Sequence, residues 1–175
     1  MPSRMQYLFD TDVLVTAWNF HYKPSFCGGF WSWLEDGIAT GTFRSVDQVG
    51  DELKGGKPPA QFVEWVKAVK AADFFIESTP AIEKWRDITT WANDPKRQYF
   101  AAAKSKFLAA DSADAWLIAY AAHAGNFKIV TNETPAPEAK KDIKLPDAAR
   151  VLGVETILLH ELLSLHSGKN FQFKS

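Results

Sequence analysis

The chain has 175 residues, which fits one domain of ordinary size and is too short for two comfortable ones. Hydrophobic residues make up 46% and charged residues 23% of the sequence, a globular composition that excludes a disordered or fibrous class. The 20 basic residues are matched by 21 acidic ones, and the net charge of -1 excludes binding of a polyanion through overall positive potential. A nucleic-acid substrate would therefore need local basic patches or bridging metal ions.

Cysteine content and hydropathy narrow the class further. Cys27 is the only cysteine, so neither an intramolecular disulfide nor a thiolate zinc site can form. No stretch reaches the roughly 18 apolar residues of a membrane span, and Asp10 and Asp12 interrupt the apolar run near the start. We therefore expect no membrane segment and no secretory signal, and we predict a cytoplasmic protein. Most of the seven Trp and thirteen Phe are expected in the core or in interfaces.

The first third of the chain predicts two strands and three helices. A short apolar strand over 6–9 runs into a polar turn, and a helix follows with Val13, Leu14, Ala17 and Trp18 on one face. A second helix is predicted over 25–41, with Phe26, Phe30, Trp33 and Leu34 in one stripe and Gly37 or Gly41 at its end. The strand over 42–46 and the short helix over 47–56 complete this part.

The middle of the chain continues the alternation of helices and strands. Residues 61–72 predict a helix with Phe62, Val66 and Val69 inward, and 74–78 predict a strand. Residues 80–107 are predicted to be helical and amphipathic, with a break near Asn93 and Pro95.

The last third contains the best-defined helix, over 111–125, which is strongly apolar and ends at Gly125. A strand over 128–133 follows, and then a polar loop over 133–147 that holds three prolines. A short helix over 148–152 leads to a strand over 154–159 and a C-terminal helix. We therefore predict one α/β domain over 1–175: three α/β/α layers around a mostly parallel sheet of four to five strands.

Four carboxylates occupy positions where such a fold binds ligands, because open parallel sheets bind ligands at the carboxyl ends of their strands. Asp10 follows the first predicted strand, and Glu133 follows the VTN with which the 128–133 strand closes after Val130. Asp114 lies in the first turn of the helix before that strand, and Glu52 lies in the helix after the second strand. Clustered carboxylates repel one another unless a cation compensates. Mg²⁺ or Mn²⁺ fits such oxygen ligands, and either ion can activate a water for attack on a phosphodiester.

The strings LFDTDVLVTAWN, VGDEL, ADAWLIAYA and IVTNE resemble, in order, the four motifs of PIN-domain nucleases. The resemblance spans about residues 6–160, includes a long helical insertion around 80–107, and is closest to a poorly characterised PIN-like branch that shares the FWSWL-like helix and the IVTNE ending. It implies a metal-dependent ribonuclease similar to the toxins of toxin–antitoxin pairs, which an antitoxin protein holds inactive.

The resemblance also implies roles for individual residues. Asp10, Glu52 and Asp114 would be metal ligands, and Glu133 would be a ligand or an outer-shell acid. Many PIN domains have Asp two residues after the Thr, where this chain has Glu133.

Two more acids are candidates at the same place. Asp12 could assist the pocket or cap the first helix. Asp111 and Asp114 share a helix side, so that one could be a ligand and the other the N-cap, and we favour Asp114 as the ligand.

Simpler interpretations accompany each of these residues. Asp10 alone could be a helix cap, and Glu52 alone a solvated helix residue. Thr11 and Thr131 are predicted turn or cap residues whose hydroxyls could touch the pocket. The four His show no metal-binding spacing. Nine lysines are expected on solvated faces, and a subset of them could track an RNA backbone: Lys54, Lys57, Lys67, Lys70, Lys104, Lys106, Lys140, Lys141 and Lys144.

Two other functions compete with the nuclease hypothesis. FDTDVL also resembles the strand-end motif of haloacid-dehalogenase phosphotransferases, with Asp10 as nucleophile and Asp12 as acid/base, although Val13 stands where that family has glycine. A catalytically silent binding module is the third possibility. Aromatic residues near Phe30, Trp31 and Trp33 would suit a homodimer or antitoxin interface if exposed, or the core if buried.

Overall fold

The sheet has five strands, all parallel, in the order β3-β2-β1-β4-β5. A computed structural model describes residues 4–175 of the chain. The strands are β1 (Gln6–Phe9), β2 (Phe43–Val46), β3 (Phe75–Ile76), β4 (Phe127–Val130) and β5 (Thr156–Ile157). Leu8 and Phe9 of β1 and Ile129 and Val130 of β4 are fully buried, as expected for central strands covered on both faces. The predicted α/β class and parallel sheet are confirmed.

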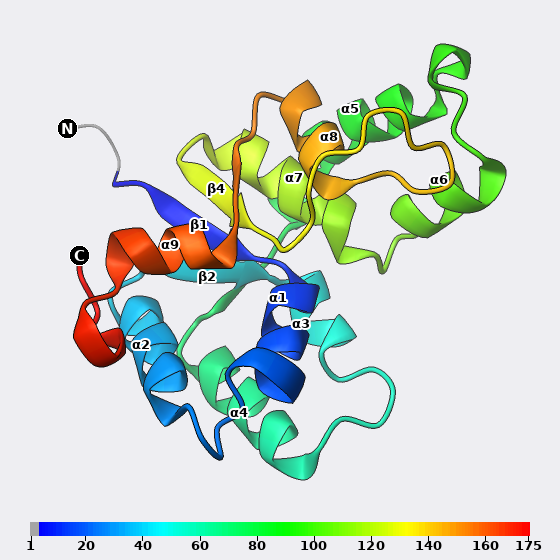
Figure 1. Cartoon of the computed structure of the whole chain (residues 1–175). Helices are drawn as coiled ribbons and strands as arrows, with labels where there is room; N and C mark the ends of the chain where they lie inside the picture. The colour runs from blue at the N-terminus through cyan, green and yellow to red at the C-terminus, as the bar shows by residue number, and fades with distance from the viewer. Residues whose placement is uncertain (1–3) are drawn as a thin grey trace.

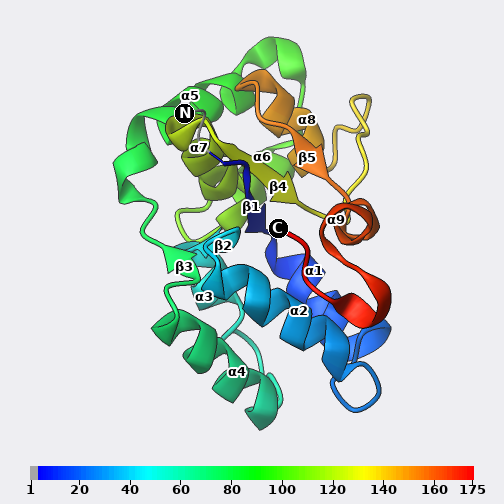
Figure 2. The same cartoon turned by 90° about the vertical axis from the view of Figure 1, so that its left-hand side faces the viewer.

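Helices cover both faces of the sheet, which gives three layers (Figures 1 and 2). Beneath it in Figure 1 lie α1 (Thr11–Thr16), the π-helical turn η1 (Ala17–His21), α2 (Gly28–Ala39), α4 (Ala60–Ala71) and α9 (Leu159–His166). Above it lie α5 (Ile82–Asn93), α6 (Ala101–Phe107), α7 (Ala113–Ala124) and α8 (Leu145–Val151). The short α3 (Asp47–Glu52) packs against both α1 and α7, and 3-10 turns occupy 79–81, 95–97 and 169–171.

An aromatic cluster fills the layer beneath the sheet, and it includes the aromatic residues of α2. Phe30 and Trp33 are fully buried and Trp31 is buried, so these three residues belong to the core and are not available as an interface. Phe43 of β2 packs its ring against Phe9 and Trp33, with ring centroids 5.2 and 4.8 Å away. Edge-to-face arrangements of this kind add to the burial of aromatic area.

Four predicted elements have wrong boundaries, and the starts of the two helices among them have a local reason. The helix predicted over 25–41 begins only at Gly28, because the amides of Phe26 and Cys27 close a turn on the carbonyl of Lys23, and Phe26 is therefore 67% exposed instead of lying in the buried stripe. The helix predicted over 148–152 begins at Leu145, since a proline fits the first turn of a helix, where Pro146 stands. The edge strands β3 and β5 are two residues long, shorter than the predicted 74–78 and 154–159.

The helices over 80–107 do break near Asn93 and Pro95, as the sequence predicts. Within residues 4–175 no helix is both long and apolar enough to cross a lipid bilayer.

Candidate active site

The carboxyl ends of β1 and β4 meet at the point where the strand order reverses. The chain proceeds from β1 outward through β2 and β3, then returns to the other side of β1 for β4 and β5. Phe9 pairs with Val130, and the backbone amide of Asp10 donates to the carbonyl of Val130 over 3.0 Å. Residues that follow these two strands therefore stand side by side, in the crevice where open α/β sheets bind ligands.

A cavity of about 700 Å³ lies at this edge and brings the predicted acids together. All six line it: Asp10, Asp12, Glu52, Asp111, Asp114 and Glu133. Thr11, Ser112 and Lys106 contribute further polar atoms to its wall. We call it the acidic cavity.

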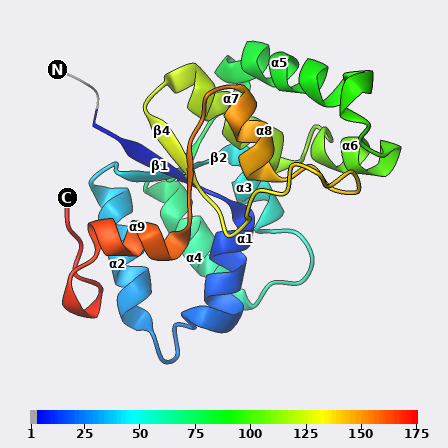
Figure 3. The same cartoon turned by 45° about the horizontal axis from the view of Figure 1, so that its top comes forward.

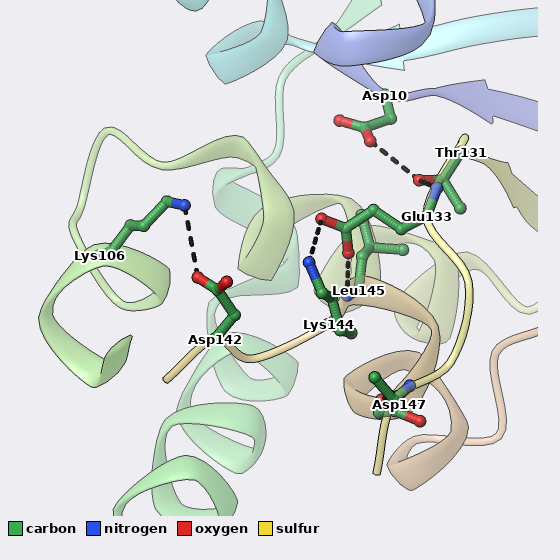
Figure 4. Close-up of polar contacts among 9 residues, drawn as sticks. Asp10, Lys106, Thr131, Glu133, Asp142, Lys144, Leu145 and Asp147 are labelled. Carbon is green, nitrogen blue, oxygen red and sulfur yellow. Dashed lines mark hydrogen bonds and ion pairs between the residues drawn. The ribbon is translucent and has the colours of Figure 1, made fainter. Parts of the chain in front are cut away.

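Asp10 is the most buried of these carboxylates, with 5% of its surface exposed. It occupies the N-cap position of α1, but its side chain makes no capping hydrogen bond. Instead, its Oδ2 accepts a hydrogen bond from Thr131 Oγ1 over 3.1 Å, and Thr131 Oγ1 also accepts from the amide of Glu133 (Figure 4). Thr131 is fully buried and does not itself line the acidic cavity, so its hydroxyl acts on the site through its hydrogen bond to Asp10.

Burial raises the pKa of Asp10 well above its ordinary value, and the negative charges of Asp114, Glu133 and Asp12 raise it further. The hydrogen bond from Thr131 acts in the opposite direction. Among residues 4–175 no lysine, arginine or histidine forms an ion pair with Asp10. A buried carboxylate without a counter-ion is unfavourable unless it is protonated or a cation binds to it.

Asp114 faces the same cavity from the first turn of α7. Burial, together with the charges of Glu133 and Glu52, raises its pKa to about 6, and this value already includes the opposite effect of Lys106 and Lys144. The expectation that Asp111 or Asp114 caps this helix is wrong. Ser112 occupies the N-cap position without a capping side-chain bond, and Asp111 is exposed at the rim.

Glu52 does the capping instead, from another helix. Its Oε1 accepts from the amide of Ala113, the first residue of α7, over 2.9 Å, and its Oε2 accepts from Thr11 Oγ1. A carboxylate at a helix N-terminus satisfies a free amide and complements the helix dipole. Glu52 therefore joins the end of α3 to the starts of α1 and α7, and it fixes the turn that carries Asp114.

Glu133 ties the segment after β4 to α8. Its Oε2 accepts from the amide of Leu145 over 2.8 Å, and its Oε1 lies 3.8 Å from Lys144 Nζ (Figure 4). Asp147 holds the same segment a little further along by accepting from the amide of Ala136 over 2.8 Å. Glu133 lines the acidic cavity, and its contacts with Leu145 and Lys144 fix the orientation of its carboxylate.

Asp12 is exposed on α1, and its Oδ1 accepts from Thr16 Oγ1 over 3.2 Å. It lines the cavity and is not the cap of the first helix, because Asp10 occupies that position.

Sequence reasoning did not single out Lys106 and Lys144 as site residues. Lys106 reaches the rim from α6 and lies 3.7 Å from Asp142, while Lys144 pairs with Glu133 (Figure 4). The segment over 134–144 runs beside α6 and is fixed there by a hydrogen bond from the amide of Phe100 to the carbonyl of Lys140 (Figure 3). Two positive charges therefore flank the carboxylates, although no local spacing signal marks either lysine.

Among protein-family models, one described as a domain of unknown function, DUF4411, matches residues 7–170. The chain belongs to this family. Comparison with curated proteins and with solved structures gives no match. The match reaches from the start of β1 past the end of α9, so that the acidic cavity of this DUF4411 chain lies wholly within the family domain.

The chemistry of this donor set fits a hard divalent cation. Asp10 and Asp114 offer carboxylate oxygens that are buried or half-buried, and no basic residue over 4–175 forms an ion pair with either. Within the described residues, no three His, Cys, Asp or Glu side chains are arranged so that they could hold an ion among them. Glu52 and Glu133 are each turned toward hydrogen bonds of their own. Mg²⁺ commonly needs only one or two carboxylates together with waters and substrate phosphate.

Without divalent metal, the free energy of unfolding of this DUF4411 chain is expected to rise as the pH falls from about 7 to about 5. The pKa of Asp114 in the folded state is about 6, above the usual 3.8, so the folded protein binds this proton more tightly than the unfolded chain does. Protonation through the folded pKa therefore relieves the repulsion and stabilises the fold. Urea unfolding in EDTA across this range measures the effect.

The double variant Asp10→Asn with Asp114→Asn is the control for this pH dependence, because it removes both titrating groups and leaves all other groups in place. Its unfolding midpoint is expected to vary less with pH than that of the wild type. Parallel profiles for the two proteins would contradict the assignment.

Proposed function

We propose that this DUF4411 chain is a PIN-like, metal-dependent ribonuclease that hydrolyses RNA phosphodiesters in the acidic cavity. Asp10 carries the proposal: it is a buried carboxylate with raised pKa, without a basic partner among the described residues, at the switch point of a parallel sheet. The order of the four PIN-like motifs supports the same function.

Asp10 and Asp114 are the residues that would hold Mg²⁺ or Mn²⁺. A bound ion would activate a water and neutralise the charge that develops on the phosphorus oxygens, so that no nucleophilic side chain is required. Thr131 orients Asp10 by its hydrogen bond, and it thereby leaves Oδ1 of Asp10 available. Glu52 is a positioning residue, since both of its oxygens already accept hydrogen bonds and it fixes the first turn of α7.

The net charge of -1 gives the chain no overall attraction for RNA, but Lys106 and Lys144 supply positive charge beside the acidic cavity. Their flexible ammonium groups at the rim suit contact with phosphates of the RNA strand. Glu133 holds Lys144 near the cavity and keeps the segment after β4 docked on α8.

RNA cleavage by the purified full chain tests the proposal. Single-stranded RNA is expected to be cut with Mg²⁺ or Mn²⁺, to remain intact in EDTA, and to be cut again when excess metal is restored. Cleavage of equal rate in EDTA, or no cleavage of any RNA with either metal, would overturn the proposed function.

Lys106→Gln is expected to weaken RNA binding about two- to fivefold and to reduce its salt dependence, because one phosphate contact is lost. Lys84→Gln is a matched control. Lys84 lies 3.7 Å from Asp87 on α5, the same separation as between Lys106 and Asp142, but it does not line the cavity. Anisotropy titrations at two salt concentrations measure both variants, and identical titrations for the two would exclude the phosphate contact.

The phosphotransferase alternative is less well supported. Its acid/base would be Asp12, whose carboxylate is exposed and accepts from Thr16 within its own helix. Its nucleophile would be Asp10, which is buried and has a raised pKa. An aspartyl-phosphate trapped on Asp10 by a phosphate analogue would favour this alternative over hydrolysis of RNA.

A protein partner, such as an antitoxin or a second copy of the chain, is also part of the proposal. Phe20 and Phe26, which flank the turn between η1 and α2, are 69% and 67% exposed and supply apolar area for such a contact. Co-purification of the chain with the product of a neighbouring reading frame, and inhibition of cleavage by that product, would support the toxin role.

A further inference from the structure

A second cavity, of about 300 Å³, adjoins the acidic cavity. Val15 and Glu52 line both cavities, so the two are direct neighbours. The second cavity lies between η1, the turn after α3 and the start of α4, on the side of the site away from Lys144. A strand that extends from the acidic cavity past Val15 and Glu52 would therefore reach the second cavity next.

Trp18 lines this second cavity, and neighbouring rings hold its side chain in place. Its centroid lies 4.8 Å from that of Phe62 and 4.9 Å from that of Trp31, and both of these rings are buried. Trp18 itself is only half-buried. A fixed aromatic ring that retains accessible surface is the feature on which single-stranded nucleic acids stack their bases.

The π-helical turn η1 brings a polar group to the same place. Consecutive residues of an α-helix point about 100° apart, yet Trp18 and Asn19 both line the cavity. Here the helix widens to a π turn, closed by a hydrogen bond from the amide of Tyr22 to the carbonyl of Ala17 over 2.9 Å. Such π turns are rare in proteins as a whole, and those that do occur often lie at functional sites.

Asn19 adds hydrogen-bonding capacity beside the aromatic ring. Its side chain is half-buried and has no hydrogen bond with any other residue over 4–175. An amide offers two donors and an acceptor, and it can bond the edge of a base that stacks nearby. Lys57 stands at the rim of the cavity as an exposed cation.

We propose that the second cavity binds one nucleobase of the RNA strand whose phosphate lies in the acidic cavity, with Trp18 as the stacking surface and Asn19 as the hydrogen-bonding group. Lys57 would contact the phosphate of that nucleotide. This inference rests on the proposed ribonuclease function and adds to it a base-binding subsite.

The test is binding of fluorescein-labelled RNA hexamers to the full chain in EDTA, measured by anisotropy. One base at a time is replaced by an abasic ribose along the hexamer. The wild type is expected to lose about 5- to 100-fold in affinity when the abasic position falls in the cavity, and about twofold or less elsewhere. Asn19→Leu should weaken binding of the intact hexamer and flatten this profile.

Asn19→Leu is used instead of Trp18→Ala because Trp18 is packed among other rings and its loss would disturb the fold. Asn93→Leu, at the end of α5, is the matched control and should keep the wild-type profile. Lys57→Gln should lower the affinity for every hexamer by a similar factor. Thermal melts of all variants test whether the fold is retained.

Equal affinity of the wild type for the intact and all abasic hexamers would overturn the subsite. So would identical profiles for Asn19→Leu and Asn93→Leu, the result expected if a protein segment occupies this cavity. Neither outcome affects cleavage in Mg²⁺ or Mn²⁺, which tests the ribonuclease function separately.

Discussion

Replacing Asp10 by asparagine is expected to slow RNA cleavage by about 10³-fold or more, since a lost metal ligand removes several kcal/mol of charge stabilisation. The amide has nearly the volume of the carboxylate and can still accept the hydrogen bond from Thr131. It cannot supply the negative charge that holds a divalent ion. Asp114→Asn is expected to have the same effect, because Asp114 would be the second ligand.

The same substitution should leave the fold intact and raise the melting temperature in EDTA. Asp10 is buried beside other negative charges, and burial with the charge of Asp114 raises its pKa. A neutral isostere removes that repulsion. The catalytic loss and the gain in stability thus have one physical cause, the concentration of negative charge that a cation would neutralise.

Asp36→Asn provides the matched control, because it removes one negative charge from the exposed face of α2 and leaves the cavity unchanged. Its cleavage rate and melting temperature are expected to match those of the wild type. The alanine variants of Asp10 and Asp114 complete the set. Retained cleavage in both alanine variants would overturn the assignment of the site.

Gly37→Ala is expected to destabilise the protein by about 3 kcal/mol or more, at the upper end of typical overpacking costs. A Cβ at Gly37 would lie 2.0 Å from Cδ2 and 2.2 Å from Cε2 of Phe43. The Phe43 ring cannot yield, because it is fully buried among the rings of Tyr7, Phe9 and Trp33. Urea unfolding of wild type and variant measures the difference.

Gly28→Ala in the same helix is the control, since a Cβ there meets no atom within 4 Å. It is expected to change stability by less than about 1 kcal/mol. Phe43→Leu should be less damaging in the Gly37→Ala background than alone, because the smaller side chain makes room for the new methyl group. Equal unfolding midpoints for Gly37→Ala and Gly28→Ala would contradict the close packing of α2 on β2.

The sequence was sufficient for the sheet and for the cluster of acids. Apolar strands that end in polar residues, as at Phe9–Asp10, mark buried parallel strands, and parallel strands bring their carboxyl ends to one edge. Asp10, Glu52, Asp114 and Glu133 do line one cavity there. These features were predictable because they depend on the hydrophobic pattern of each segment and on the alternation of strands with helices, and both can be read along the chain.

The bonds made by these acids were not predictable, because each joins segments far apart in the chain. Glu52 bonds the amide of Ala113, 61 residues later, and Glu133 bonds the amide of Leu145 across the loop. A backbone amide has the same chemistry at every residue but proline, so no sequence signal identifies these partners. Ser112, and not Asp111, occupies the N-cap position of α7 for the same reason: the capping acceptor comes from another helix.

The positions of Lys106 and Lys144 beside the carboxylates could not be predicted from the sequence either. Lys106 and Lys144 belong to the nine lysines that the sequence places on solvated faces, and their neighbours in the sequence do not distinguish them from the other seven. The two lie near each other because the segment over 134–144 docks on α6, through the backbone bond between Phe100 and Lys140 and the ion pair between Lys106 and Asp142. Tertiary placement, and not composition, separates them from the lysines that remain on solvated faces.

The central place of β1 has a consequence for how the protein is made. β1 is synthesised before β4, so Asp10 acquires its neighbour Thr131 only when β4, about 120 residues further along, pairs with β1. A nascent chain that ends before this point holds an open sheet edge and an unassembled cavity. The acidic cavity thus forms late in synthesis, and a truncated translation product that lacks β4 would be released without it.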